Sequence, residues 1–135
     1  LSDLQSRFGI SYLFISHDLG VVRYVADRVA IMYLGAIVEV GLTEDVFNPP
    51  HHPYTESLIS ALPTLQSSPD RPEIRLVGAP PTPGDSFQGC PFASRCPRRI
   101  DNICDEQPPP VQHLDSGRAL ACHIPVIELA EVQRT

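Results

Sequence analysis

The sequence predicts an α/β fold that continues into a proline-rich, mostly irregular extension containing cysteines. The first 47 residues alternate between patterns typical of helices and patterns typical of strands, and this order is characteristic of α/β proteins. None of the fifteen prolines lies in this part, and the first is Pro49. Because proline has no backbone N–H and interrupts helix interiors, the second part should consist of loops and short turns.

The first predicted elements are a helix, a buried strand and a second helix. Apolar residues recur at helical spacing over residues 1–8, and Gly9 is suited to end that helix. Residues 10–15 are almost continuously apolar, which indicates a strand covered on both faces in a parallel sheet. Asp18 can then cap a helix over residues 19–26.

Two more strands should follow this helix. Residues 29–33 and 37–40 are short apolar runs, and Leu34-Gly35 between them is suited to a tight connection. Thr43 offers an N-cap for a short helical turn that reaches Phe47. The first part of the chain should therefore contain two or three strands together with helices.

The rest of the chain contains one clear helix pattern. Pro53 is suited to a first helical position, and apolar residues follow on one side as far as Leu62. Residues 66–73 form a polar linker, residues 74–77 are compatible with a short strand, and the last ten residues with a frayed helix. The predicted divisions are a domain end, a linker helix, a four-cysteine extension and a tail, at residues 1–47, 48–65, 66–125 and 126–135.

The charge of the chain argues against a nucleic-acid partner. The formal net charge is -6, and the ten basic residues are all arginines. A general nucleic-acid binder needs a basic face, which this balance does not favour. No stretch approaches the roughly 20 apolar residues of a membrane span, and the opening Leu1-Ser2-Asp3 does not resemble an export signal.

His17 is the first candidate for chemistry. It stands where the predicted strand at residues 10–15 ends and the next helix begins. In open α/β sheets ligands bind beyond the carboxyl ends of strands, and a histidine there can donate a hydrogen bond to a phosphate oxygen. The alternative is that Ser16-His17-Asp18 is only a surface or capping feature of the helix start.

Four cysteines in the second part are the other candidate. Cys90, Cys96, Cys104 and Cys122 follow the spacing C-x5-C-x7-C-x17-C, and their region has few apolar residues to form a core. A small domain of this kind usually needs a staple, which can be an iron–sulfur cluster, a zinc ion or disulfides. His123 adjoins Cys122, so a zinc site with three cysteines and one histidine stays open, as do free structural thiols.

The sequence carries no catalytic dyad and no phosphate-binding loop. The adjacent acidic pairs Glu44-Asp45 and Asp105-Glu106 point their side chains apart, so they do not form a paired acid and base. The chain has no lysine, and the glycines are scattered, so the motif G-x-x-x-x-G-K-[ST] is absent. These residues alone should not cradle a phosphate.

Several segments resemble a known family. Residues 10–19, with Ser16-His17-Asp18, resemble the switch-histidine segment of ABC-transporter ATPases. Pro50-His51-His52-Pro53-Tyr54-Thr55 resembles the HPYT signature of the ATPase subunits of oligopeptide, dipeptide and nickel importers. The cysteine motifs at residues 89–97 and 121–123 resemble the C-terminal extension of the same subfamily. The resemblance implies the C-terminal part of an ABC ATPase domain.

The resemblance also implies a function. Two ATPase subunits of this family enclose ATP and Mg²⁺ and drive a transmembrane permease, which an extracytoplasmic substrate-binding protein supplies. The subunit lies peripherally on the cytoplasmic face of the membrane. His17 aligns with the switch histidine, a catalytic and nucleotide-binding residue that contacts the γ-phosphate.

The resemblance narrows the metal site and limits the fragment. Cys90, Cys96, Cys104 and Cys122 align with cysteines that hold a 4Fe–4S cluster in some relatives, and zinc is the alternative. The phosphate loop and the catalytic acid of the family have no counterpart here, so the fragment alone should be inactive. The alternative function is a non-catalytic, metal-stapled interaction module that contacts the partner ATPase or the permease.

Overall fold

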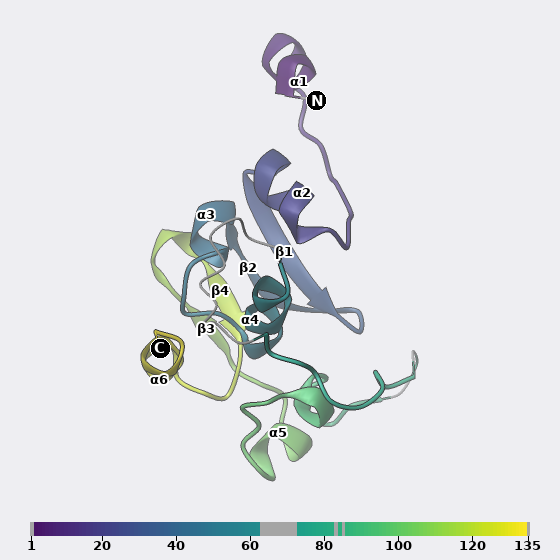
Figure 1. Ribbon diagram of the computed structural model, residues 1–135, viewed down its shortest axis with the longest axis vertical. Helices are drawn as coiled ribbons and strands as arrows, with labels where there is room; N and C mark the ends of the chain where they lie inside the picture. Colours follow the sequence, from purple (N-terminus) through teal and green to yellow (C-terminus); the bar gives the residue numbers. More distant parts are fainter. Residues whose placement is uncertain (1, 63–72, 83, 85, 135) are drawn as a thin grey trace.

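The fold is a four-stranded antiparallel sheet surrounded by short helices (Figure 1). The computed structural model describes residues 2–62, 73–82, 84 and 86–134. The strand order is β1-β2-β4-β3. The strands are β1 (Arg28–Tyr33), β2 (Ala36–Leu42), β3 (Val111–His113) and β4 (Ala119–Ala121).

The β1–β2 hairpin confirms the strands predicted at residues 29–33 and 37–40. Leu34 and Gly35 both have positive φ, 46° and 82°, which is the geometry of a two-residue hairpin turn. Along β1 every second side chain is buried, so the hairpin packs one face against the core. The turn chemistry and the alternation together explain why this part was predictable.

The β3–β4 hairpin shows that the predicted irregular extension is partly wrong. β4 pairs with β2 through Glu39↔Leu120 and Val40↔Ala119, and β3 pairs with β4. Both strands have three residues, too few for a recognisable alternation of apolar and polar side chains. The second part of the chain therefore completes a sheet that the first part begins.

The prediction of a buried parallel strand at residues 10–15 is also wrong. These residues are extended but form no strand, and the described sheet is antiparallel throughout. Leu13 and Ile15 are 93% and 89% exposed. A strand needs a neighbour for its backbone hydrogen bonds and a layer to cover its apolar face, and no described residue provides either for this segment.

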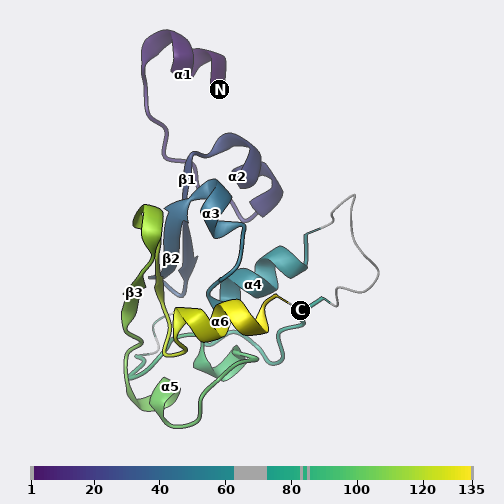
Figure 2. The ribbon, with the colours of Figure 1, turned by 90° about the vertical axis from the view of Figure 1, so that its left-hand side faces the viewer.

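The first helix, α1 (Ser2–Phe8), confirms the prediction for residues 1–8. The Gly9 N–H donates to the Gln5 carbonyl at 2.9 Å, which closes the last turn. Figures 1 and 2 show that α1 stands apart from the sheet at the end of the extended segment.

The second helix, α2 (Leu19–Val25), begins at its predicted cap. The Val21 N–H donates to Asp18 Oδ1 at 3.1 Å, and Leu19 and Val22 are buried. The expected cap of α3 (Thr43–Val46) is wrong, because Leu42 occupies the cap position. The Thr43 hydroxyl instead donates to the Ala26 carbonyl at 2.6 Å and joins α3 to the end of α2.

The remaining helices surround the sheet. Pro53 begins α4 as predicted, and a helix forms near the C-terminus, while residues 74–77 form no strand. The polar linker predicted at residues 66–73 lies outside the described residues except for Glu73. The helices are α4 (Pro53–Ser60), α5 (Ile103–Glu106) and α6 (Val126–Val132), with 3₁₀ turns η1 (Ala93–Arg95) and η2 (Asp115–Gly117).

The main core joins residues that are far apart in the sequence. Its members are Leu19, Val22, Val29, Ile31, Tyr33, Val38, Val46, Phe47 and Phe92. Phe92 comes from the cysteine-rich part, is fully buried, and packs edge-on against Tyr33 at 5.1 Å between ring centroids. Burying such a ring stabilises the fold by roughly 1.5–3 kcal/mol. A second cluster of Leu120, Cys122 and Leu129 lies under α6.

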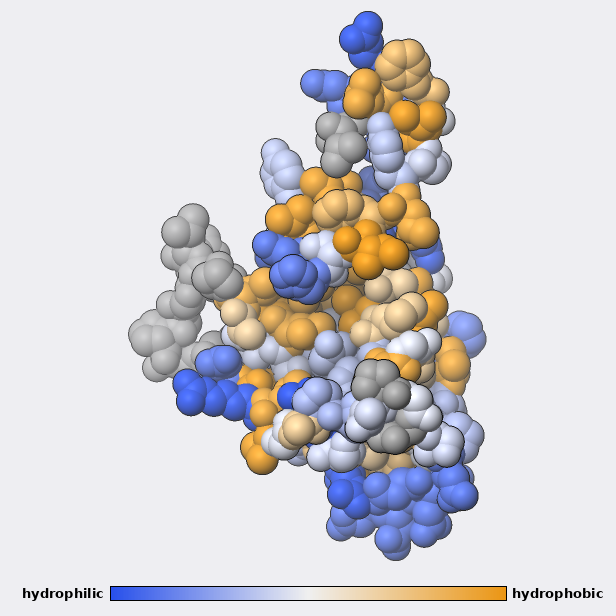
Figure 3. All heavy atoms as spheres, turned by 90° about the vertical axis from the view of Figure 1, so that its right-hand side faces the viewer, coloured by the Kyte–Doolittle hydropathy of each residue, from blue (hydrophilic) through white to orange (hydrophobic). Residues whose placement is uncertain are grey.

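Figure 3 shows how hydropathy is distributed over one face. Apolar side chains are concentrated toward the end of the molecule that carries α1 and α2, whereas the opposite end, with α5, is hydrophilic. Within the described ranges, every helix is too short or too polar to cross a membrane.

Candidate functional site

The predicted site residues fall into two separate regions. His17 is exposed in the bend that precedes α2. Neighbouring polar groups shape this bend, because the Asp18 N–H donates to the Ser16 hydroxyl at 3.0 Å and the Asp18 carboxylate caps α2. Cys104 lies in α5, near the opposite end of the molecule (Figure 1).

The four cysteines come from three arms of the chain. Cys90 and Cys96 flank the η1 turn, Cys104 lies in α5, and Cys122 follows β4. The Cys90 N–H donates to the Cys104 carbonyl at 2.7 Å, which ties the first arm to the second. A Cβ on Gly89 would lie 2.3 Å from that same carbonyl oxygen, so only glycine permits this crossing.

The four thiols share one neighbourhood. Burial raises the pKa of Cys90, that of Cys96 to about 12 and that of Cys122 to about 11. The negative charges of the other cysteines add to these increases, and every pair among the four interacts in this way. Without a cation the thiols of Cys90, Cys96 and Cys122 are therefore protonated at neutral pH, and a bound cation would reverse the effect.

The donor chemistry fits a metal, but the arrangement is not that of an assembled site. Four thiolates are the donor set of structural zinc and of iron–sulfur clusters. Among the described residues, no three His, Cys, Asp or Glu side chains are grouped closely enough to hold an ion. His123 Nε2 donates to the Gln107 carbonyl at 2.9 Å, so this nitrogen is already engaged. The cysteines therefore converge without forming a complete coordination shell.

The HPY residues, His52-Pro53-Tyr54, occupy a buried position between the sheet and the cysteine arms. The His52 N–H donates to Glu39 Oε2 at 2.9 Å, and the His52 side chain faces the Ala121 backbone. Burial lowers the pKa of His52 to about 4, so its ring is neutral at pH 7. His52 Nδ1 accepts from the Tyr54 N–H at 3.1 Å, which caps α4 and leaves the ring proton on Nε2.

Glu39 and Arg118 form a buried ion pair beside this cap. Glu39 is 1% exposed and Arg118 is 4% exposed. Arg118 donates to Glu39 Oε1 from Nε at 2.9 Å and from Nη2 at 2.6 Å. Burial raises the pKa of the Glu39 carboxyl, and the Arg118 charge opposes this shift. The guanidinium is completely satisfied, because it also donates to the carbonyls of Asp45, Asn48 and Pro50.

A second set of polar residues connects α4 to the segment after η1 and to the end of α6. Arg98 donates to Glu56 through Nε at 2.9 Å and Nη2 at 2.8 Å. Gln133, at the end of α6, donates to Glu56 Oε2 at 3.1 Å and to the His51 carbonyl at 2.9 Å. The His51 N–H in turn donates to Gln133 Oε1 at 2.6 Å. Figure 2 shows α6 beside α4.

Sequence reasoning missed this polar network. The recognisable signal is Glu39, a charged residue that interrupts the apolar run at residues 37–40. Such a charge is rarely buried without a partner. The partner, Arg118, lies 79 residues away in the chain, and no local sequence pattern around Glu39 points to it.

Comparison with known proteins identifies the family. The family described as "Oligopeptide/dipeptide transporter, C-terminal region" matches residues 38–104. The chain is 45% identical over 122 residues to the dipeptide transport ATP-binding protein DppF of Haemophilus influenzae, covering 90% of this chain and 37% of that protein. The chain belongs to this family. The matched region includes the HPY residues and three of the four cysteines.

Other relatives agree with this assignment. The chain is 46% identical over 124 residues to a probable peptide ABC transporter ATP-binding protein, y4tS, of Sinorhizobium fredii, covering 92% of this chain and 35% of the relative. It is 44% identical over 122 residues to DppF of Escherichia coli, covering 90% and 36%. The chain thus spans little more than a third of the length of these relatives.

Proposed function

We propose that this chain is part of the ATP-hydrolysing subunit of an ABC importer for dipeptides, oligopeptides or nickel. The observation that carries the proposal is the similarity over nine-tenths of the chain to proteins named as peptide-transport ATP-binding proteins. ATP and Mg²⁺ are bound mainly by residues of the subunit other than those in this chain. The partners are a second ATPase subunit and the transmembrane permease, with a substrate-binding protein acting indirectly, at the cytoplasmic face of the membrane.

His17 is proposed as the switch histidine of this subunit. Its exposure leaves the imidazole accessible to a nucleotide that other residues hold. An imidazole N–H directed at the γ-phosphate would stabilise the charge that develops during phosphoryl transfer. The exposed apolar side chains at residues 10–15 are compatible with a position against another part of the subunit.

The test is His17→Ala in the full-length subunit assembled with its permease. We expect the rate of ATP hydrolysis to fall by about a hundredfold, the order of effect found when one transition-state donor is removed. ATP binding should change much less. His113→Ala is the matched control, because His113 is also an exposed histidine. Hydrolysis that stays within about twofold in His17→Ala, as in the control, would contradict the switch assignment.

A second proposal concerns Cys90, Cys96, Cys104 and Cys122. We propose that these cysteines hold a 4Fe–4S cluster, with zinc as the alternative, in an extension that contacts the partner ATPase or the permease. The mutual interaction of all four thiols supports this proposal. The metal would cross-link three arms of a region whose own apolar core is small.

Anaerobic purification of the full-length subunit tests the metal proposal. An iron–sulfur cluster would colour the protein brown and give equal amounts of iron and acid-labile sulfide, whereas zinc would leave it colourless. Single Cys→Ser variants should lose the metal, and Ser94→Ala, in the same region, should keep it. Wild-type protein that contains neither metal when purified anaerobically would overturn the proposal.

A further inference from the structure

We propose that Glu39 and residues 51–56, the segment that contains the HPY signature, form a scaffold that sets the mutual position of the cysteine-bearing arms. In this view the signature residues are positioning residues and do not contact nucleotide or transported substrate. The inference rests on the proposed cysteine site for its purpose. The contacts that carry it anchor the arm of Cys122 at Arg118 and the arm of Cys90 and Cys96 at two points, and the arm of Cys104 is connected to them through Cys90.

The arm that bears Cys122 is anchored to Glu39 and His52. Arg118, four residues before Cys122, makes the two bonds to Glu39 Oε1 at 2.9 and 2.6 Å. The His52 side chain faces the backbone of Ala121, the residue that immediately precedes Cys122. Glu39 and Arg118 are buried, so water does not compete for the bonds between them. The position of Cys122 is therefore set chiefly by the Arg118–Glu39 pair.

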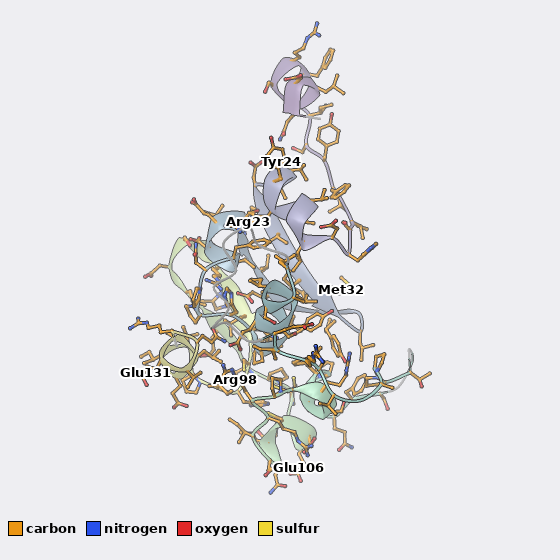
Figure 4. All side chains as sticks on the ribbon, viewed as in Figure 1. Arg23, Tyr24, Met32, Arg98, Glu106 and Glu131 are labelled. Atoms are coloured by element: carbon orange, nitrogen blue, oxygen red, sulfur yellow. The ribbon has the colours of Figure 1, made fainter. Side chains whose placement is uncertain are left out.

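The arm that bears Cys96 is anchored to Glu56. Arg98 follows Cys96 by two residues. It donates two hydrogen bonds to the Glu56 carboxylate, from Nε to Oε2 at 2.9 Å and from Nη2 to Oε1 at 2.8 Å. This fork-to-carboxylate geometry fixes orientation as well as distance. The Arg98 and Glu56 side chains are 26% and 13% exposed, so the pair is partly shielded from water. In Figure 4 Arg98 lies on the side of the molecule that carries α5.

The arm that bears Cys90 and Cys96 is also anchored by packing, near Cys90. Phe92 follows Cys90 by two residues, and its ring lies 5.2 Å from that of Tyr54 and 5.9 Å from that of His52, measured between centroids. Cys104 is carried along, because its carbonyl accepts the Cys90 N–H. The same short segment thus contacts close neighbours of Cys90, Cys96 and Cys122, and it reaches Cys104 through Cys90.

Simple stabilisation of the fold is the competing explanation for this network. A purely structural role predicts a lower stability without a specific change in how the thiols stand relative to one another. A scaffold predicts that loosening one anchor separates thiols even while the protein stays folded. A reagent that must bridge two thiols distinguishes these explanations, because its affinity depends on their effective concentration.

The experiment uses the full-length subunit purified with a thiol reductant, and phenylarsine oxide as the probe that bridges two thiols. Glu56→Gln and Arg98→Ala remove the charge pair, and Arg98→Lys retains the charge. We expect the two disrupting variants to bind the arsenical about tenfold more weakly than wild type. Arg98→Lys should recover most of the affinity. Glu131→Gln and Arg134→Ala, exposed residues near the C-terminus, are the matched controls and should bind as wild type.

Circular dichroism establishes which variants are folded. If Arg98→Ala does not fold, Glu56→Gln provides the test, because it preserves the size of the side chain. Arsenical binding equal to wild type in the folded disrupting variants overturns the scaffold, as does a wild type that bridges no thiols. A wild type that binds the arsenical tightly but takes up neither iron nor zinc overturns only the metal proposal. The two failures are therefore distinguishable.

Discussion

The segment around His17 and the polar network around Glu39 differ in what holds their side chains in place. His17 follows an extended segment whose apolar side chains are exposed, and the bend is ordered by local bonds of Asp18, to the Ser16 hydroxyl and to the Val21 N–H. Glu39 is enclosed by the sheet, the HPY segment and Arg118. Figure 4 illustrates the separation, with Arg23 and Tyr24 of α2 far from Arg98.

This difference separates two kinds of functional residue. A side chain with few contacts in its own chain can be positioned only by what it meets in the complete assembly. Residues that are buried and mutually bonded position one another within this chain. Substitutions in the two regions should therefore differ in their effect on stability, with the largest loss expected at Arg118.

Arg118→Ala should be the most destabilising substitution. It leaves the Glu39 carboxylate buried without its partner, which typically costs 3–5 kcal/mol. Urea unfolding of the variant and of the exposed Arg134→Ala control measures the difference in the free energy of unfolding. A loss below about 1 kcal/mol, typical of a surface ion pair, would remove the contrast between the two regions.

Phe92→Ala should destabilise the protein by about 3 kcal/mol, because it opens a cavity between Tyr33, Tyr54 and His52. Phe87→Ala is the matched control, since Phe87 is in the same part of the chain but is 40% exposed. Thermal or urea unfolding should show a much smaller effect for the control. Equal losses in the two variants would show that the cysteine region is not anchored through Phe92.

Acid should weaken the network through His52. The pKa of His52 is lowered to about 4 in the folded state by burial, whereas an unfolded histidine titrates near 6.5. Between these values the unfolded state binds more protons, so this contribution is present at neutral pH and is lost as pH falls from about 6.5 to about 4. The loss should approach roughly 3 kcal/mol.

Unfolding free energies measured across this pH range test the expectation. His52→Asn should remove the part of the acid dependence that comes from the imidazole, and the Glu39 contribution remains in both proteins. His113→Asn, at an exposed position, should leave the profile unchanged. Identical profiles for wild type and His52→Asn would show that the His52 ring does not titrate as its burial requires.

Leu13→Ser should have the smallest effect on the stability of this 135-residue chain. Leu13 is 93% exposed, so replacing it should change the free energy of unfolding by less than about 0.5 kcal/mol. The same substitution in the full-length subunit should cost more if the segment is covered there. Equal, negligible effects in both contexts would show that nothing packs on this side chain.

The comparison also shows why some elements were predictable and others were not. The β1–β2 hairpin and the start of α2 depend on local signals, namely the Leu34-Gly35 turn and the Asp18 cap. Residues 10–15 have a correct pattern for a buried strand but no partner among the described residues. The pattern of apolar residues shows which structure a segment prefers, but a strand forms only if a second strand is available to pair with its backbone.

The candidate sites were predictable to different extents. Residue type and spacing singled out Cys90, Cys96, Cys104 and Cys122; their thiols interact with one another in the folded chain, and their role as metal ligands stays a prediction. The same reasoning did not find Glu39, Arg118 or Gln133, because their importance lies in contacts across 79 to 82 residues of chain. A polar residue has no local mark that reveals such a partner.

The amino-acid sequence by itself determined the hairpin turn, the starts of α2 and α4 and the family, because these depend on residues that are close together in the chain. Only the tertiary structure decided that the second part of the chain adds β4 to the sheet, that residues 10–15 stay uncovered by the described residues, and that Arg98 and Arg118 pair with Glu56 and Glu39. The physical reason is that backbone pairing and the satisfaction of a buried charge require specific partners. Those partners are brought together by folding, and no local pattern specifies them.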